Sequence, residues 1–452
     1  MTTRRRTFLK TTAAATCGFH FIPSHVLGGA GEAPATSKLN VAAIGAGGQA
    51  AADLRNMESE NIVALCDVDD RRAAEMFKRH PEAKRYKDFR KMLDEMSGSI
   101  DAVLVGTPDH THAVAVMAAL AHGKHVYCEK PLAHSVAEVR ALRKAAAERK
   151  VVTQVGNQGH SSDSIRVFCE WIWDGAIGNV TEVHAGCDAF PDVYCQQRNL
   201  VAIAEERPAV PAELDWNLWQ GPAAARPYHP AYVPWNWRGW TPYGTGTLGD
   251  WVCHVIDPIF WALDLDMPTS IQAETDGFDP AKHADVFPVG SQVTFEFAAK
   301  GKRGPVKLVW YDGRRRVPRP AELEGGRKDI GTGAVVIGDR GKIVYGSHGA
   351  GGVRIIPEAA MKAYQRPEPK IPRVRGGHQH DWLNAIREGR PAGSPFEYGG
   401  RLTEIGLLGA IAIRMTGKKL QYDEQAIRFT NCDEANPLLD PLARAGWGLK
   451  KA

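Results

Sequence analysis

The chain has 452 residues, of which 44% are hydrophobic and 24% are charged. This composition is typical of a globular protein with a sizeable core, and the length suggests two or three domains. The formal net charge is only +4, which argues against a nucleic-acid partner and against attraction to an acidic membrane. No apolar stretch is long enough for a transmembrane helix, so no stable membrane insertion is expected.

Residues 1–35 are predicted to form an export signal. They have a basic start, a weakly apolar middle and small residues at the end, which is the order of a cleaved signal peptide. The stretch "RRTFLK" at 5–10 resembles a twin-arginine signal, which is an address for the twin-arginine export machinery. A disordered basic tail is the alternative. The mature protein is therefore expected to be periplasmic or otherwise exported.

From Leu39 onward, short apolar runs alternate with helical stretches. This alternation predicts βαβ units and a parallel sheet. The strands are nearly continuous hydrophobic runs, as in sheets that are buried on both faces. Strands are predicted at 39–45, 62–67, 100–107, 125–130 and 151–156, and helices at 48–57, 70–80, 112–122 and 135–149. We therefore expect an α/β fold with an N-terminal Rossmann domain, a doubly wound parallel sheet, over residues 39–157.

A glycine pattern follows the first predicted strand. "VAAIGAGGQAA" places Gly45, Gly47 and Ala50 in a G-x-G-x-x-A arrangement that opens a helix. Such a loop makes a tight turn and lets the backbone approach a pyrophosphate. A tight turn without a ligand is the alternative. The expected cofactor contacts in this loop are Gly45, Ala46, Gly47, Gly48 and Gln49.

Asp67 ends the second predicted strand, about 20 residues beyond the glycine loop. A carboxylate at this place would bind ribose hydroxyls and repel a 2′-phosphate, so NAD is favoured over NADP. Arg71 and Arg72 follow closely and weaken that preference.

The regular alternation of strands and helices ends after residue 157. Residues 191–247 are rich in proline, glycine and tryptophan and are predicted to form long loops. The spacing of the later strands suggests an antiparallel sheet. Strands are predicted at 179–186, 269–275, 291–298, 305–311, 333–337 and 342–345, and helices at 163–174, 378–388 and 402–416. Residues 158–452 are assigned to a second, C-terminal domain.

The stretch "GDWVCHVID" carries three titratable side chains in an apolar helix. Residues four apart lie on one helical face, so Asp250 and His254 should project together, with Asp257 close by. The alternatives are a core histidine held by an aspartate, or a metal site. No HExxH pattern and no CxxC pair occur, so no metal is expected.

Three motifs together resemble the Gfo/Idh/MocA oxidoreductase family: "TPDHTHA" (107–113), "CEKPLAHS" (128–135) and Asp250-x-x-x-His254. The tryptophan-rich insertion and the twin-arginine signal look like an exported branch of that family. The resemblance implies a Rossmann domain followed by an α+β domain with a large open, mostly antiparallel sheet. Members transfer hydride between a nicotinamide cofactor and, usually, a sugar or polyol. They often form dimers or tetramers through the open sheet face, so a homo-oligomer is expected.

The resemblance also implies roles for particular residues. Thr107, Pro108 and His112 would line the cofactor. Glu129 and Lys130 would stand near the nicotinamide and the substrate.

The catalytic set is predicted to be Lys130, Asp250 and His254. Histidine titrates near neutral pH, so His254 is assigned as the general base. Lys130 would donate a hydrogen bond to the developing alkoxide. Asp250 would bind a neighbouring hydroxyl or stabilise the charged form of His254.

Substrate contacts are expected from the segment that leads into the catalytic helix. Trp237, Arg238, Trp240 and Tyr243 offer flat faces and hydrogen bonds to a sugar, although most aromatic residues are core residues. "NQGHSS" follows the last Rossmann strand, so Asn157 is expected at the cofactor and His160 at the substrate. Asp257 could contact substrate or be structural.

We therefore expect an NAD-dependent oxidoreductase acting on a secondary hydroxyl of a sugar, polyol or glycoside. The alternative is an NAD-dependent glycosidase that uses transient oxidation, elimination, water addition and reduction. A metal hydrolase and a non-catalytic sugar sensor are two further classes. Export implies that NAD is loaded in the cytoplasm and stays tightly bound.

Overall fold

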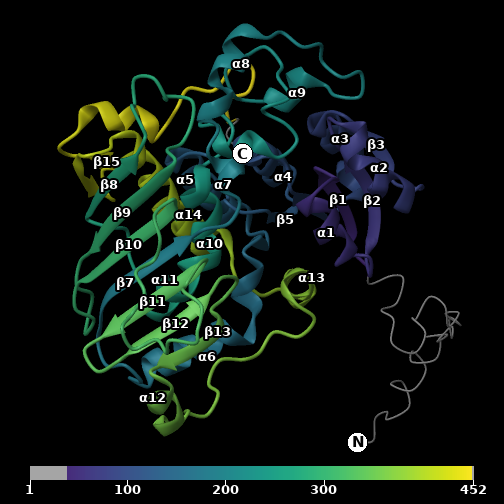
Figure 1. The fold of residues 1–452 in the computed structure, drawn as a ribbon. Helices are drawn as coiled ribbons and strands as arrows, with labels where there is room; N and C mark the ends of the chain where they lie inside the picture. The colour runs from purple at the N-terminus through teal and green to yellow at the C-terminus, as the bar shows by residue number, and fades with distance from the viewer. Residues whose placement is uncertain (1–37, 450–452) are drawn as a thin grey trace, which may run out of the picture. The chain divides into compact units, whose positions relative to one another are not determined.

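Two β-sheets organise residues 38–449, the part of the chain that the computed structural model describes (Figure 1). The predicted export signal, residues 1–35, lies outside the described residues. Within residues 38–449, no helix has both the length and the apolar character needed to cross a membrane. All cysteines from Cys66 to Cys432 are free thiols.

The first sheet has the strand order β3-β2-β1-β4-β5-β6, and all its pairs are parallel. This is the doubly wound order, so the predicted Rossmann fold is confirmed. Its strands are β1 (Asn40–Ile44), β2 (Asn61–Cys66), β3 (Lys84–Tyr86), β4 (Ala102–Val105), β5 (His125–Cys128) and β6 (Thr153–Val155). Its helices are α1 (Gln49–Arg55), α2 (Asp70–Arg79), α3 (Phe89–Met96), α4 (Asp109–Ala121) and α5 (Val136–Arg149).

Two differences from the predicted elements have simple causes. Strand β3 was missed because it is three residues long, "KRY", and has no apolar run. Helix α4 begins at Asp109, three residues before the predicted start at 112. Asp109 is therefore a buried residue of the first helical turn.

The second sheet has nine strands in the order β13-β12-β11-β7-β10-β9-β8-β14-β15. Only the β7–β10 pair is parallel, so the predicted mostly antiparallel sheet is confirmed. The strands are β7 (Val180–Cys187), β8 (Ser270–Asp276), β9 (Gly290–Phe297), β10 (Val306–Gly313), β11 (Gly333–Gly338), β12 (Lys342–Gly346), β13 (Gly351–Ile356), β14 (Lys419–Asp423) and β15 (Arg428–Phe429).

Nine α-helices follow β6 in the described part of the chain. The segment 191–247, predicted as loops, contains three short helices. The helices are α6 (Asp163–Trp173), α7 (Pro191–Tyr194), α8 (Leu200–Glu205), α9 (Trp216–Gln220), α10 (Gly246–Val255), α11 (Asp257–Ala262), α12 (Glu358–Ala363), α13 (His378–Glu388) and α14 (Phe396–Arg414).

The two faces of the nine-stranded sheet are covered differently. Leu308 and Trp310 of β10 point toward the main core, whereas Val309 points to the opposite face, as the two-residue period of a strand requires. On that opposite face, Val317 and Leu323 from the connection after β10 pack over β10, β11 and β12. Part of this face is therefore already covered within the chain, and a homo-oligomer formed through it stays a prediction.

Helix α13 belongs to the Rossmann core although it comes late in the chain. Trp382 and Leu383 share a buried cluster with Leu104 and Tyr127 of the first sheet. Such a return of the chain explains why the described residues from Leu39 onward form one compact unit.

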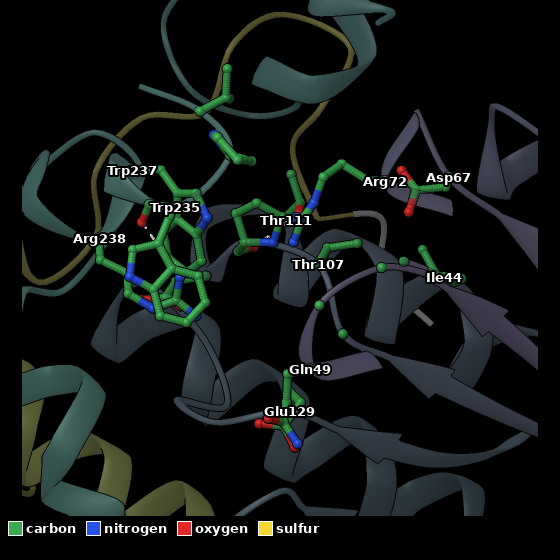
Figure 2. A pocket seen from close by; sticks show the side chains of 18 of the residues that line it. Ile44, Gln49, Asp67, Arg72, Thr107, Thr111, Glu129, Trp235, Trp237 and Arg238 are labelled. Carbon is green, nitrogen blue, oxygen red and sulfur yellow. Dashed lines mark hydrogen bonds between the residues drawn. The ribbon is translucent and has the colours of Figure 1, made fainter. Parts of the chain in front are cut away.

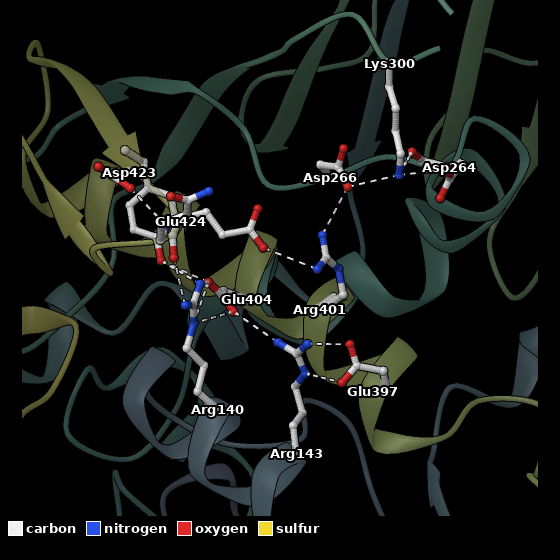
Figure 3. Close-up of polar contacts among 12 residues, drawn as sticks. Arg140, Arg143, Asp264, Asp266, Lys300, Glu397, Arg401, Glu404, Asp423 and Glu424 are labelled. Carbon is white, nitrogen blue, oxygen red and sulfur yellow. Dashed lines mark hydrogen bonds and ion pairs between the residues drawn. The ribbon is translucent and has the colours of Figure 1, made fainter. Parts of the chain in front are cut away.

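A buried ion pair ties the Rossmann helix α5 to α14 (Figure 3). Glu404 is fully buried and binds the Arg140 guanidinium, and it also accepts a hydrogen bond from the Tyr422 hydroxyl at 2.9 Å. Arg143 lies 3.9 Å away from the same carboxylate. Burial by itself would lower the pKa of Arg140, but Glu404 outweighs this effect and raises it.

We expect Glu404→Gln to lower the free energy of unfolding by about 3 kcal/mol, because the partly buried Arg140 loses its buried anionic partner. The measurement is thermal or urea unfolding. Lys144→Ala on α5 is the control, because the exposed Lys144–Glu148 pair should be worth about 0.3–0.5 kcal/mol. Equal losses of unfolding free energy in the two variants would contradict the assigned role of Glu404 in joining α5 to α14.

Candidate active site

A glycine-rich loop joins β1 to α1 and forms one wall of a cavity. Gly45 has a φ of 87°, and a Cβ atom there would lie 2.7 Å from the carbonyl oxygen of Gly106. A Cβ atom at Gly47 would lie 2.6 Å from the carbonyl oxygen of Arg72. Neither position has space for a side chain, so the backbone itself faces the cavity, as a pyrophosphate requires.

The Asp67 carboxylate lies beside this loop at the end of β2. It accepts hydrogen bonds from the backbone amides of Ala46 at 2.8 Å and Asp69 at 2.9 Å, which fix its position. Burial raises its pKa. Arg72 lines the same end of the cavity, whereas Arg71 pairs with Asp69 instead. The loop and the fixed carboxylate fit the adenosine and pyrophosphate parts of a dinucleotide.

The cavity has a volume of about 450 Å³ and runs from the Rossmann loop to the second half of α10. Figure 2 shows Asp67 and Arg72 at one end, Trp235, Trp237 and Arg238 at the other, and Thr107 between them. Thirteen of the residues predicted from the sequence line it: Gly45, Gly47, Gly48, Gln49, Asp67, Thr107, Pro108, Glu129, Lys130, Trp237, Arg238, Asp250 and His254. The other seven do not: Ala46, His112, Asn157, His160, Trp240, Tyr243 and Asp257.

Asp250 is the centre of a buried charge cluster. Its Oδ1 lies 2.5 Å from the Lys130 ammonium, and its Oδ2 accepts hydrogen bonds from Arg238 Nε at 3.3 Å and from the Tyr194 hydroxyl. Burial alone would raise the pKa of Asp250, but Lys130 and Arg238 hold it below its usual range. Burial would likewise lower the pKa of Lys130, yet Asp250 raises it. Both groups are therefore charged at neutral pH.

His254 has different neighbours from those expected. Its ring stacks on His348 with centroids 4.2 Å apart, and its Nδ1 is buried with no hydrogen-bond partner among the described residues. Burial, together with the nearby charge of Lys130, moves the pKa of His254 well below its usual range. Asp250 favours the charged form of His254, as expected, but burial and Lys130 outweigh this effect.

Asp257 lies in a separate polar joint, not beside His254. It is fully buried and accepts hydrogen bonds from Asn157 Nδ2 at 3.0 Å and from the Tyr398 hydroxyl at 2.5 Å. His160 Nδ1 lies 3.0 Å from the same carboxylate. The apolar helix ends before Asp257, which begins α11, and this break turns its side chain away. The expected ligand contacts of Asn157 and His160 are corrected to structural ones, and for Asp257 the structure matches the structural alternative.

Trp240 and Tyr243 also pack inside the protein. Both are buried in an aromatic cluster with Trp216 and Tyr232, and Trp240 Nε1 donates to a backbone carbonyl of the same segment. They support the shape of the insertion, and the expectation that they contact substrate is corrected.

His112 supports the cavity without lining it. Its Nδ1 lies 2.8 Å from the Pro131 carbonyl oxygen and its Nε2 lies 2.8 Å from the Thr107 carbonyl oxygen. Burial lowers its pKa to about 4. The ring is therefore neutral and can donate to only one of the two carbonyls, while it packs between the "TPDH" and "EKP" loops that carry Thr107 and Lys130.

Several cavity residues were not singled out from the sequence. Tyr194 and His348 come from connections that carry no local motif, and only the fold brings them to α10. Asp109 lies inside a quoted motif but was given no role. Its carboxylate is buried and accepts a hydrogen bond from Thr245 at 2.9 Å. Burial, followed by repulsion from Asp250, raises its pKa to about 7.

Glu129 also faces the cavity as a buried acid. Gln158 donates a hydrogen bond to its Oε1 at 2.7 Å. Burial and the nearby Asp53 carboxyl raise the pKa of Glu129 well above its usual range, and burial raises that of Asp53 to about 6.

Among the described residues, no group of three or more His, Cys, Asp or Glu could hold a metal ion.

Two family descriptions match the chain. Residues 39–157 match "Oxidoreductase family, NAD-binding Rossmann fold", and residues 199–449 match "Oxidoreductase family, C-terminal alpha/beta domain". The second match covers more than half of the chain. The protein therefore belongs to the Gfo/Idh/MocA oxidoreductase family, as its motifs indicated. Its assignment to an exported branch stays a prediction.

Individual relatives match over part of their length. Levoglucosan dehydrogenase of Pseudarthrobacter phenanthrenivorans is 28% identical over 193 residues, 43% of this chain and 40% of that protein. Myo-inositol 2-dehydrogenase of Thermotoga maritima is 29% identical over 128 residues, 28% of this chain and 38% of that protein. The matches thus span about two fifths of these relatives.

The fold is also similar to solved structures. Levoglucosan dehydrogenase in complex with NADH superimposes with a TM-score of 0.55 over 85% of this chain and 99% of that one, at 18% identity. Aldose-aldose oxidoreductase from Caulobacter crescentus, complexed with glycerol, has a TM-score of 0.54 at 16% identity, over 85% of this chain and 100% of that one. At this level of identity the similarity shows the fold alone.

The pKa of Asp109 gives a prediction for stability. Because that pKa rises from 3.8 to about 7 on folding, the folded state holds a proton that the unfolded state has released between these values. The free energy of unfolding therefore falls as the pH rises through this window. An asparagine at this position cannot release a proton, so the Asp109→Asn variant should not show this loss of stability. The difference in melting temperature, variant minus wild type, should therefore be more positive at pH 8 than at pH 5.

The matched control is Asp433→Asn, because the Asp433 side chain is largely exposed and its ion-pair partner is Arg428 and not a histidine. Its melting temperature relative to wild type should differ little between the two pH values. A difference between Asp109→Asn and wild type that is the same at pH 5 and pH 8 would contradict the assigned protonation.

Proposed function

We propose that the protein is an NAD-dependent oxidoreductase that acts on a secondary hydroxyl of a sugar, polyol or glycoside. The observation that supports this most strongly is a single cavity that joins the glycine loop and Asp67 to the Lys130–Asp250 pair. The relatives named for levoglucosan and myo-inositol are consistent with a polyhydroxylated substrate.

The residues at the α10 end suit alcohol oxidation. NAD, when bound, would supply the hydride acceptor. Lys130 remains an ammonium because Asp250 raises its pKa, so it can donate a hydrogen bond as negative charge develops on the hydroxyl oxygen. Arg238, which is also held by Asp250, presents further donors to neighbouring hydroxyls. Trp237 is buried beside it, and the Arg238 guanidinium lies over the Trp237 ring, so Trp237 supports Arg238 and the predicted stacking of a sugar on Trp237 is not proposed again.

His254 is assigned as the proton acceptor, but its share of the rate enhancement is smaller than the sequence suggested. It is a neutral base because burial lowers its pKa, and it lines the cavity near Lys130. Its charged form would leave a buried Nδ1–H without an acceptor, so protonation is costly. Stabilisation of the alkoxide by Lys130 must therefore carry most of the rate enhancement.

A redox-neutral glycosidase is the second candidate, and Asp109 favours it. Its pKa of about 7 keeps a fraction of this buried carboxyl protonated at neutral pH, as a general acid for a leaving oxygen must be. Product analysis separates the two reactions. A keto-sugar with stoichiometric NADH supports the oxidoreductase, whereas free sugar without net NADH supports the glycosidase.

We expect Lys130→Met and Asp250→Asn each to lower turnover by about two to four orders of magnitude. His254→Ala should cost less than Lys130→Met. The measurement is a screen of sugars and glycosides with wild type, followed by kcat for each variant on the active substrate. Asp257→Asn is the control for buried charge near α10, and it should alter melting more than kcat per folded molecule. Near-full activity of Lys130→Met would overturn its role.

We further propose that the cofactor is NAD and that it stays bound through the catalytic cycle. Asp67 faces the cavity and would repel a 2′-phosphate. If the predicted export occurs, no nicotinamide pool is expected outside the inner membrane, so a freely exchanging cofactor would be lost. Each turnover must then return the cofactor to its starting state, by a second substrate or by a redox-neutral reaction.

The corresponding measurement is the dinucleotide content of protein purified without added cofactor. After gel filtration and denaturation, we expect nearly one NAD per chain and little NADP. Asp67→Ala should lose most of the bound NAD, whereas Arg71→Ala should retain it, because Arg71 pairs away from the cavity. Protein that is empty, or that carries mostly NADP, would contradict this part of the proposal.

A further inference from the structure

Two aromatic side chains stand exposed at the wall of the cavity. Phe190 is 53% exposed and Trp235 is 42% exposed, and both line the cavity. Their rings meet edge to face, with centroids 6.2 Å apart. The other large, exposed hydrophobic residues among 38–449 lie elsewhere: Trp173, Val201, Val210, Ile427 and Leu442. We call Phe190 and Trp235 the aromatic rim.

Each member of the rim is attached to a residue that holds Asp250. Phe190 directly precedes α7. The last residue of this helix, Tyr194, donates a hydrogen bond from its hydroxyl to Asp250. Trp235 stacks on Arg238, whose guanidinium carbon lies 4.3 Å from the Trp235 ring centroid. Arg238 in turn donates to Asp250. Trp235 is therefore separated from the Asp250 carboxylate by one side chain, that of Arg238, whereas Phe190 lies one short helix before Tyr194.

Phe190 is also held in an unfavourable backbone conformation. Its φ of 51° and ψ of 47° lie in the left-handed region, which bulky residues seldom adopt. Burial does not compensate for this strain, because more than half of the side chain is exposed. Strain kept at an exposed position is typical of functional sites.

We propose that the aromatic rim binds a second ring, attached to the sugar that reacts at Lys130 and Asp250, so that the substrate is a glycoside and not a free monosaccharide. This inference rests on the proposed function. Phe190, Trp235 and Lys130 line the same cavity, and Arg238 lies between Trp235 and the Lys130–Asp250 pair. A ring whose hydroxyl lies at Lys130 would therefore leave the exposed rim available for a further group of the substrate. A second ring can cover the rim with its apolar face, whether it is another sugar or an aromatic aglycone.

The test measures binding to the NAD-saturated Lys130→Met protein by calorimetry, so its result does not depend on turnover. The one-ring ligands are glucose and galactose. The two-ring ligands are maltose, cellobiose, lactose and phenyl β-glucoside. We expect at least one two-ring ligand to bind about tenfold more tightly than its one-ring counterpart. Preference for a disaccharide over phenyl β-glucoside, or the reverse, identifies the second ring.

Variants of the rim complete the test. Phe190→Asn removes the ring but tolerates the left-handed backbone, and Trp235→Ala removes the other ring. Both should abolish the tenfold preference and leave one-ring binding unchanged. Trp173→Ala, an exposed tryptophan outside the cavity, should keep the preference.

Three results would overturn the inference: no preference for two rings in the Lys130→Met protein, a preference that survives both rim variants, or a change of oligomeric state in the rim variants by sedimentation. The last result would mean that another copy of the chain covers the rim. Hydride transfer by wild type to one-ring sugars, with no gain in affinity or turnover for any two-ring ligand, would reject the rim and leave the proposed function standing. A two-ring preference in binding, with no hydride transfer by wild type to any ligand, would reject the proposed function and leave the rim standing.

Discussion

The Asp250 carboxylate, buried against Lys130, is the interaction on which the candidate site depends. Lys130 follows a Rossmann strand and Asp250 lies on a helix of the second part of the chain, so the pair joins the two. Each group favours the charged form of the other in a buried place, and Arg238 adds to this effect on Asp250. A positive charge is thereby fixed beside the cavity, where a developing alkoxide can use it.

The rest of the structure maintains this pair at the end of a dinucleotide-sized cavity. His112 joins the two Rossmann loops, and the buried Arg140–Glu404 pair holds α5 against α14. The Asp257 joint fixes the end of α10. These contacts explain why several polar residues that look catalytic in the sequence are structural in the fold. The connection after β10 covers part of the outer sheet face, so an oligomer would have less of that face available.

The sequence predicted what local patterns encode. The glycine loop, Asp67 and the buried parallel strands follow from short-range rules, and the Rossmann order is as expected. Residues that arrive from distant segments could not be predicted, as Tyr194 and His348 show. Asp257 was misplaced because helical spacing assumes one continuous helix, whereas α10 ends before it. Short strands such as β3 lack an apolar run and gave no pattern to detect.

A crystal structure of the protein with NADH would test the central claim most directly. Our account predicts the adenosine ribose at Asp67, the pyrophosphate against the backbone of Gly47, and the nicotinamide beside an intact Lys130–Asp250 pair. A dinucleotide bound elsewhere, or a nicotinamide that ends away from Lys130, would contradict it.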